Sequence, residues 1–352
     1  MSADHESADV LDPVTARLPS APVSAPEPPG REDRRERLVG IVQRSGAFVM
    51  LVLTLLVGTL VFGGSFATSD NLVRNIAGGS AFLALVAVGM TFVIISGGID
   101  LSVGSVLAMS AVLTAYAYSE WGTVAALVVP LAAAGLVGLV NGLLVARAGM
   151  APFIVTLATL LFARGVAFKV TDEGSETRQI DRDSLVATLG QSSWLGVPLP
   201  VVFAIIALVV GAVVLNRTRF GQSVFAIGGS EDAALLMGLP VRRTTTLLYV
   251  NSSLLAGLAG LLIAARSSTG EPTAGNGLEL QAIAAVVIGG TLLTGGVGTM
   301  SGTLAGVVLL AVIRNLLNQV GTLSPYYQDV VSGLFLLAVV VVQTLLSKRR
   351  LT

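Results

Sequence analysis

The sequence lacks several residue types on which enzymes and metal sites depend. None of its 352 residues is a cysteine, so it has no disulfide, no thiolate nucleophile and no thiolate metal site. Its single histidine, His5, lies in a polar N-terminal segment, which argues against histidine-based metal or acid–base chemistry. The G-x-S-x-G motif of serine hydrolases is also absent. These absences make an enzyme, including a membrane enzyme, the least favoured class.

Lysine and charge are scarce as well. Lys169 and Lys348 are the only lysines and neither follows a glycine, so the chain has no Walker A loop with which to hydrolyse ATP. Charged residues make up 12% of the chain, whereas a soluble domain carries about a quarter. Hydrophobic residues make up 53%, and 14 of the 42 charged residues precede Ala47. The composition therefore predicts a polytopic membrane protein.

The N-terminal segment differs from the rest of the chain. Residues 1–45 are polar, and six of the 13 prolines fall between Pro13 and Pro29. This composition is typical of disorder, and the segment lacks the early apolar core of a cleaved signal peptide. We expect a disordered cytoplasmic tail over 1–45, a transmembrane domain over 46–346 and a basic cytoplasmic C-terminus over 347–352.

The apolar part of the chain divides into segments of helical-span length. A span needs roughly 20 apolar residues at about 1.5 Å each. We therefore expect an all-α polytopic membrane protein with about ten transmembrane helices, or eight or nine if the short third and ninth segments are re-entrant. The ten segments are 46–66, 75–96, 102–118, 122–145, 150–170, 197–216, 244–264, 279–298, 302–316 and 329–346.

The placement of arginine and lysine sets the expected orientation. With the N-terminus inside and ten spans, 14 of the 21 basic residues fall inside and five outside, so both termini are expected in the cytoplasm. Arg164 and Arg314 fall within spans. No acidic residue lies deep in a span to pair with them, and Glu279 sits only at an edge, which counts against a carrier coupled to ions through buried carboxylates.

Two loops are longer than simple turns. The loop 171–196, expected outside, carries seven charges. The loop 217–243, expected inside, contains Ser230 followed by two acidic residues, and a Gly-Leu-Pro stop begins at Gly238. Because a serine N-cap and acids in the first turn favour a helix, we predict a short cytoplasmic helix over Glu231–Met237 with an apolar face that must dock on something.

Small residues recur at helical spacing in several segments. In membranes such residues let helices approach closely, so we interpret them as packing faces and not as ligand sites. They are Gly138 with Gly142, Ala256 with Gly260, and Gly298 with Gly302 and Gly306.

The hairpin Gly89–Ser110 is interrupted by a Gly-Gly pair and by Asp100. Unwound backbone at membrane depth is tolerated only beside protein or a wet cavity. A capped turn at the inner interface is the favoured interpretation, and a substrate contact is the alternative. Polar residues within or beside spans are the usual markers of a translocation path. The candidates are Asp100, Asn141, Thr156, Arg164, Asn251, Gln281 and Asn315, with Arg314 beside the last.

Four stretches in order resemble a known family. They read GMTFVIISGGIDLSVGSVLAMSA, VNGLLVARAGMAPFIVTLATLLFARGVAF, FGQSVFAIGGSEDAALLMGLPV and AAVVIGGTLLTGGVGTMSGTLAGVVLLAVIRNLLN. Together they resemble the permease subunits of ribose/xylose-type bacterial ABC importers, over roughly residues 47–346. The resemblance implies a multi-pass protein of the bacterial cytoplasmic (inner) membrane with a type II-like importer permease bundle.

The resemblance also implies partners. They are a second copy of the chain, a cytoplasmic ATPase subunit that holds ATP and Mg²⁺, an extracytoplasmic solute-binding protein and the lipid bilayer. The chain itself needs no cofactor, and no nucleic-acid partner is expected. The loop 217–243 is implied to couple the permease to the ATPase. The coupling residues would be Gly229, Ser230, Glu231, Asp232, Ala233, Leu236, Met237 and Gly238.

The function expected from this resemblance is import of a monosaccharide or a related sugar-like solute by alternating access. The binding protein would supply most of the affinity, so the path through the permease should be only weakly polar. A secondary, ion-coupled sugar carrier that works without an ATPase is the main alternative. A membrane scaffold, in which the polar residues of the spans would be inert to substitution, is a third.

Overall fold

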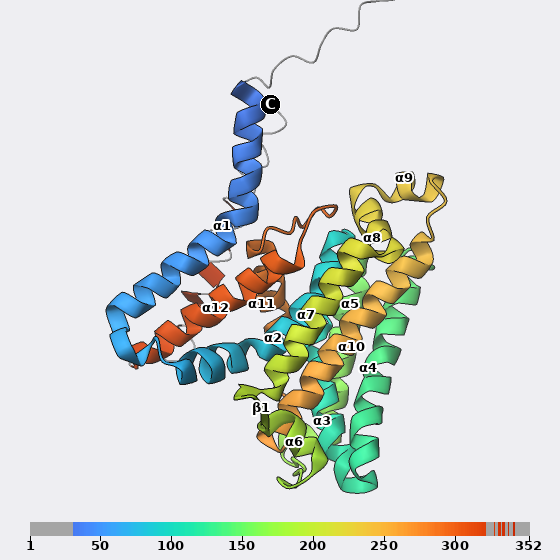
Figure 1. The fold of residues 1–352 in the computed structure, drawn as a ribbon. Coiled ribbons are helices and arrows are strands. Elements are labelled where there is room, and N and C mark those ends of the chain that lie inside the picture. The colour runs from blue at the N-terminus through green and yellow to red at the C-terminus, as the bar shows by residue number, and fades with distance from the viewer. Residues whose placement is uncertain are drawn as a thin grey trace, which may run out of the picture. The chain divides into compact units, whose positions relative to one another are not determined.

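A computed structural model describes the backbone of residues 31–321, side chains from residue 46 onward, and single residues between 327 and 341 (Figure 1). The chain divides into two units, Met1–Val39 and Gly40–Thr352. The helices that carry the candidate sites all belong to the second unit. The predicted C-terminus 347–352 lies outside the described residues, as do residues 1–30.

Helix α1, Arg31–Phe62, begins inside the segment for which we predicted disorder. Residues 31–45 are therefore helical, and the prediction was wrong for this part of the tail. The physical reason is that prolines stop at Pro29, and the run REDRRER that follows is made of residues that favour helix, chiefly arginine and glutamate.

Helices dominate the rest of the described chain. Short or irregular helices are η1 (Gly63–Ser65), η2 (Asn71–Ala77), η3 (Asp172–Gly174), α6 (Leu185–Gln191), α8 (Arg219–Gly229) and α9 (Glu231–Leu236), and one hairpin is formed by β1 (Ser193–Trp194) and β2 (Val197–Pro198). Longer helices are α2 (Gly78–Ile95), α3 (Val103–Trp121), α4 (Thr123–Ala146), α5 (Pro152–Val170), α7 (Leu199–Arg217), α10 (Val241–Ser267), α11 (Leu278–Ile288) and α12 (Met300–Val320).

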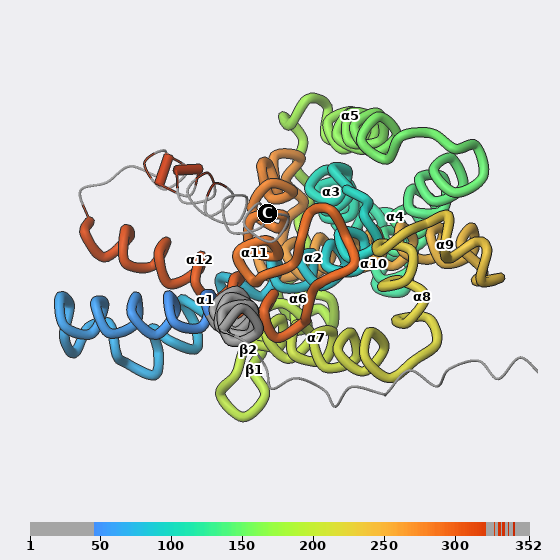
Figure 2. Tube along the Cα trace, turned by 90° about the horizontal axis from the view of Figure 1, so that it is seen from above, coloured from blue at the N-terminus to red at the C-terminus, as the bar shows by residue number. Residues whose placement is uncertain are grey.

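Helix α2 forms the centre of the bundle. It is apolar on all sides, and 94% of its most apolar stretch is buried, against 28% for α4 and 22% for α5. Helices α7, α10, α11 and α12 pack around it (Figure 2). The peripheral helices keep apolar side chains exposed, as expected of surfaces that face lipid.

Seven helices of the described residues are long and apolar enough to cross a membrane. They match the first, second, fourth, fifth, sixth, seventh and ninth predicted segments. The third segment is helical as α3, but serine, threonine and tyrosine lower its hydropathy. The tenth, 329–346, lies outside the continuously described chain. The structure thus confirms a polytopic helical membrane protein.

The eighth predicted span, 279–298, was wrong. Helix α11 has 11 residues, about 16 Å of helix, which is roughly half of what a bilayer requires. The chain then leaves the helix until Met300, and Gly290 and Gly295 adopt φ values of +90° and +86°. Only glycine takes these conformations readily, so the glycines end the helix despite the apolar residues around them.

The small-residue faces are packing faces, as predicted. A β-carbon at Gly138 of α4 would lie 2.6 Å from the carbonyl oxygen of Tyr249 in α10, and one at Gly142 would lie 2.7 Å from Cα of Thr246. Gly260 meets the backbone of α3 in the same way, and Gly302 and Gly306 meet the backbone of α11 and its end.

Candidate transport cavity and coupling element

The predicted helix of the loop 217–243 is confirmed as α9. The Ser230 hydroxyl caps it by accepting a hydrogen bond from the Ala233 amide at 3.3 Å, and Gly238 ends the segment at φ +74°. Leu236 and Met237 are 90% and 67% exposed, whereas Ala234 is buried. The eight residues predicted for coupling all lie in the ten-residue segment from Gly229 to Gly238, which has an exposed apolar face. Sequence reasoning missed α8, which precedes it.

Helix α8 contacts the two places where the central helices are interrupted. One is the turn 96–102 between α2 and α3, and the other is the segment 289–299 between α11 and α12. The two are joined by a hydrogen bond from the Gly296 amide to the Ile95 carbonyl at 2.8 Å. Gly228 packs directly on that bond, so that any β-carbon there would overlap the Ile95 carbonyl oxygen. Gly228 therefore lies at the contact between the two interruptions.

A cavity of about 490 Å³ with both polar and apolar lining lies among η2, α2, α10, α11 and α12. We call it the amide cavity, because its lining is rich in asparagine and glutamine. It is lined by Asn71, Asn75, Ile76, Gly79, Ser80, Phe82, Leu83, Ile263, Arg266, Leu278, Gln281, Leu310, Ala311, Arg314, Asn315, Asn318 and Gln319.

A chain of amide hydrogen bonds holds one wall of the amide cavity. Asn71 and Asn315, both buried, exchange two bonds of 3.0 and 2.8 Å. Asn75 donates to the Asn71 oxygen at 2.9 Å, and Gln319 donates to the Asn315 oxygen at 3.0 Å. On another wall, the side-chain amide of Gln281 in α11 has no hydrogen-bond partner within the part of the chain that the structure describes. Its amide can therefore bond to a ligand.

The local fold of η2 brings asparagines into this wall. Residues Asn71–Ala77 form a π-helix, a rare geometry that occurs frequently at functional sites. Asn71 and Asn75 lie on one side of it, and both line the amide cavity. Arg74, from the same turn, lines a different cavity.

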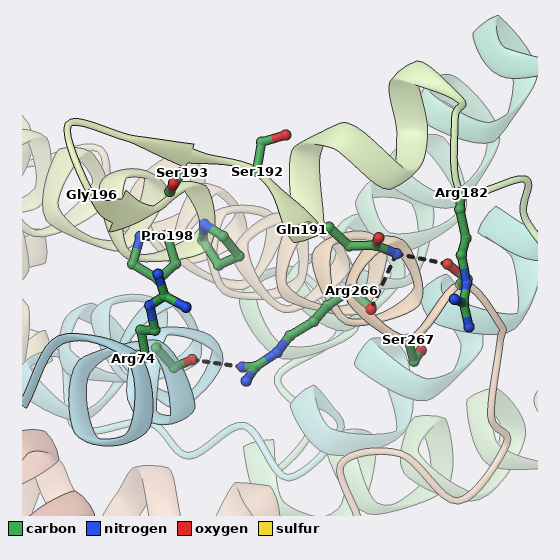
Figure 3. A pocket seen from close by; sticks show the side chains of 13 residues that line it. Arg74, Arg182, Gln191, Ser192, Ser193, Gly196, Pro198, Arg266 and Ser267 are labelled. Atoms are coloured by element: carbon green, nitrogen blue, oxygen red, sulfur yellow. Dashed lines mark hydrogen bonds between the residues drawn. The ribbon is translucent and has the colours of Figure 1, made fainter. Parts of the chain in front are cut away.

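That second cavity, of about 460 Å³, is lined by three arginines, and we call it the arginine basin (Figure 3). Arg74, Arg182 and Arg266 come from η2, the loop before α6 and the end of α10. Arg74 is paired with the exposed Asp70 at 2.9 Å. The basin lies beside α6 and β1, at the opposite end of the bundle from α9 (Figure 1).

Arg266 separates the two cavities, since it lines both. Its Nη1 donates to the Gly78 carbonyl at 3.0 Å, and its guanidinium lies 5.7 Å from the centre of the Phe82 ring. Gln191 supports the same end of α10 by donating to the Ser268 hydroxyl at 2.7 Å (Figure 3).

The other predicted path residues lie apart from these cavities. Asp100 is fully buried and accepts two hydrogen bonds from Ser102, 3.0 Å from the amide and 2.6 Å from the hydroxyl. Asn141 donates to the same hydroxyl at 3.1 Å. These contacts hold the turn between α2 and α3, while Asp100 Oδ2 is buried without a hydrogen-bond partner among the described residues, so the capped turn and the substrate contact both stay predictions.

On α5, the Thr156 hydroxyl bonds to the Pro152 carbonyl of its own helix at 2.8 Å. Arg164 donates to the carbonyls of Pro272 and Ala274 at 2.6 and 3.0 Å, and the Glu279 carboxylate attracts it. Glu279 is thus a partial partner that we did not expect, and its Oε2 is buried without a hydrogen bond among the described residues. Asn251 lines a separate, mostly apolar cavity of about 430 Å³.

Comparison with known proteins decides the family. Residues 72–340 match the family described as the branched-chain amino acid transport system / permease component. The chain belongs to this family of permeases. It is therefore a multi-pass membrane protein, and the resemblance seen in its motifs is confirmed.

Curated relatives cover nearly the whole permease. The ribose import permease protein of Bacillus subtilis strain 168 is 39% identical over 310 residues, 88% of this chain and 95% of the relative. Its counterpart in Escherichia coli strain K12 is 39% identical over 304 residues, 86% and 94% of the two chains. The L-arabinose transport system permease protein of the same strain is 38% identical over 298 residues, 83% and 88% of the two chains.

Of the predicted path residues, Gln281 and Asn315 line the same cavity, together with Arg314. The others lie elsewhere in the described chain. Sequence reasoning missed Asn71, Asn75 and Arg266. Two asparagines four residues apart in an apolar segment were a usable signal for a polar helix face. Arg266 offered none, because its position depends on how α10 ends against α2.

Proposed function

We propose that the protein is the membrane-spanning subunit of an ATP-binding cassette importer for a monosaccharide such as ribose or arabinose. The observation that carries the proposal is the similarity, over more than four fifths of the chain, to permeases named for the import of these two sugars. The amide cavity supports it, because planar amides donate and accept hydrogen bonds and match the hydroxyls of a sugar.

The exposed face of α9 docks on a separate ATPase subunit in this proposal. Leu236 and Met237 supply apolar surface that the described chain leaves uncovered, and no Walker A loop is present for the chain to hydrolyse ATP itself. Closure of two ATPase subunits would push α8–α9 against both helix interruptions, because Gly228 lies on the bond that joins them. The bundle would then alternate between outward and inward openings of one path, which lies at the axis of a homodimer.

The arginine basin receives the binding protein. It lies at the end of the bundle opposite α9, which is the outer end if α9 is cytoplasmic. Three guanidinium groups attract carboxylates, and arginine is well suited to bidentate pairing with them. We therefore expect acidic side chains on the binding protein to meet Arg74, Arg182 and Arg266.

Co-purification tests this assignment. Deletion of Glu231–Met237 should abolish association with the ATPase subunit and ATP-dependent uptake, while membrane insertion and purification yield stay unchanged. If the ATPase still co-purifies with the deleted permease, the coupling role of α9 is wrong.

A secondary carrier is the alternative, and one observation favours it. Asp100 is fully buried and Glu279 holds a buried oxygen without a hydrogen-bond partner in the described chain, so carboxylates are present where the sequence indicated none. An ion-coupled carrier would import sugar in vesicles that contain no ATPase subunit, provided that a proton or sodium gradient is imposed.

A further inference from the structure

The buried carboxyl group of Asp100 lies in a cluster of polar atoms to which the proposed function gives no role. Its Oδ1 accepts two hydrogen bonds from Ser102, whereas its Oδ2 has no hydrogen-bond partner among the described residues. The side-chain nitrogen of Asn141 donates to the same Ser102 hydroxyl, and Asn141 Oδ1 is likewise buried without a partner in the described chain. Two side chains with an unpartnered acceptor oxygen therefore meet at one hydroxyl.

Two hydroxyl groups of α10 belong to the same cluster. Ser252 lies near enough to influence the Asp100 carboxyl group, and the charge of Asp100 acts on Tyr249. Both side chains are buried, and neither hydroxyl oxygen has a hydrogen-bond partner among the described residues. The cluster thus joins the turn between α2 and α3 to α4 and to α10.

The charge of the cluster indicates the kind of ligand that it would bind. Asp100 forms no ion pair with a basic residue of the described chain. The two bonds from Ser102 and the nearby N-terminus of α3 favour the ionised carboxylate, whereas burial opposes it unless a counter-charge is present. One monovalent cation would neutralise the carboxylate, whereas a divalent ion would leave an excess positive charge in the interior.

We infer that one sodium ion is bound by Asp100, Asn141, Tyr249 and Ser252. Carboxylate, amide and hydroxyl oxygens are the ligands of hard cations, and sodium, which is smaller than potassium, suits a site with few of them. A cavity of about 260 Å³, lined by Tyr249 and by Glu231 at the start of α9, gives access to this side of the cluster. The ion stays in the chain, where it stabilises the junction of the turn with α4 and α10, and it is not transported.

Thermal unfolding of the purified full-length permease in detergent tests the inference, with sodium alone as the probe. Replacing about 100 mM choline chloride by the same concentration of NaCl should raise Tm by about 3 °C or more, and KCl should raise it by less than half as much. Asp100→Asn should abolish the effect of sodium, because its side chain carries no charge to neutralise. Glu279→Gln is the matched control, since it changes a carboxyl group with a buried, unpartnered oxygen on another helix and should keep the response.

The inference is overturned if NaCl and choline chloride give the same Tm, as expected if Asp100 is protonated or bonded to buried water. It is also overturned if KCl and NaCl raise Tm equally, or if Asp100→Asn responds as the wild type does.

A second variant keeps the test decisive if Asp100→Asn does not fold. Ser252→Ala removes one neutral ligand and should raise the sodium concentration that gives half of the Tm shift by about threefold or more. An unchanged concentration contradicts the site. Because no uptake is measured, these outcomes are separate from those that test the proposed import of sugar.

Discussion

At the scale of single residues, most polar side chains in the bundle serve the fold, and a few are left for function. Ser102 bonds to one oxygen of Asp100 and to the side-chain nitrogen of Asn141, whereas the other oxygen of each is buried without a partner among the described residues. The Thr156 hydroxyl bonds to its own helix. Gln281, in contrast, lines a cavity without a partner in the described chain. A list of polar residues in spans cannot separate these cases, because the difference lies in which neighbours the fold supplies.

The Asn71–Asn315 pair gives a prediction for stability. Asn315→Leu should destabilise the protein by about 1–3 kcal/mol, because the buried Asn71 side chain would lose both bonds to Asn315 and keep only those to Phe66 and Asn75. The measurement is Tm in detergent. Asn71→Leu with Asn315→Leu should recover part of the loss, since neither amide of the pair is then left without the other. A double variant that is as unstable as the two losses added would count against a mutual bond.

Gly228 gives a prediction for coupling. Gly228→Ala would press a methyl group onto the Ile95 carbonyl, so binding-protein-stimulated ATP hydrolysis should fall well below half of the wild-type rate. Gly165→Ala in α5 is the control, because nothing lies within 4 Å of a β-carbon there and the residue is outside the coupling segment. Equal stimulation in both variants would mean that the contact of α8 with the helix interruptions carries no signal.

At the scale of elements, local signals were predictable and the interruptions were not. The serine cap and the Gly-Leu-Pro stop predicted α9 to within one residue, because both act over a single turn. After α11, Gly290, Gly295 and Gly296 adopt positive φ values, and the last two lie against α8, which comes from a distant part of the sequence. The π-helix η2 has no sequence signature of its own. The arginine basin likewise joins elements far apart in the chain.

The basin gives a prediction at this scale. Arg182→Glu should weaken the docking of the binding protein and lower its stimulation of ATP hydrolysis, with a larger deficit at low salt, where charge attraction is least screened. Lys169→Glu removes an exposed positive charge that lies outside the basin and serves as the control. Equal losses in the two variants would point to general charge attraction and not to the basin.

At the scale of the whole molecule, the fold places two sites at opposite ends of one bundle. The segment α8–α9 holds the exposed apolar face at one end, and the arginine basin opens at the other, next to the amide cavity (Figure 1). Composition predicted the membrane class, since low charge and long apolar segments leave few alternatives. The position of the amide cavity was not predictable from the sequence, because its lining comes from five separate elements: η2, α2, α10, α11 and α12.

The account's central claim is that this permease imports a sugar at the expense of ATP hydrolysed by a partner. The most direct test is uptake of labelled ribose and arabinose into proteoliposomes that contain the permease, with and without its ATPase subunit, and with binding protein outside. The account predicts uptake of at least one sugar that requires the ATPase and ATP and is lost on deletion of Glu231–Met237. Uptake that persists without the ATPase and follows an imposed ion gradient would contradict it.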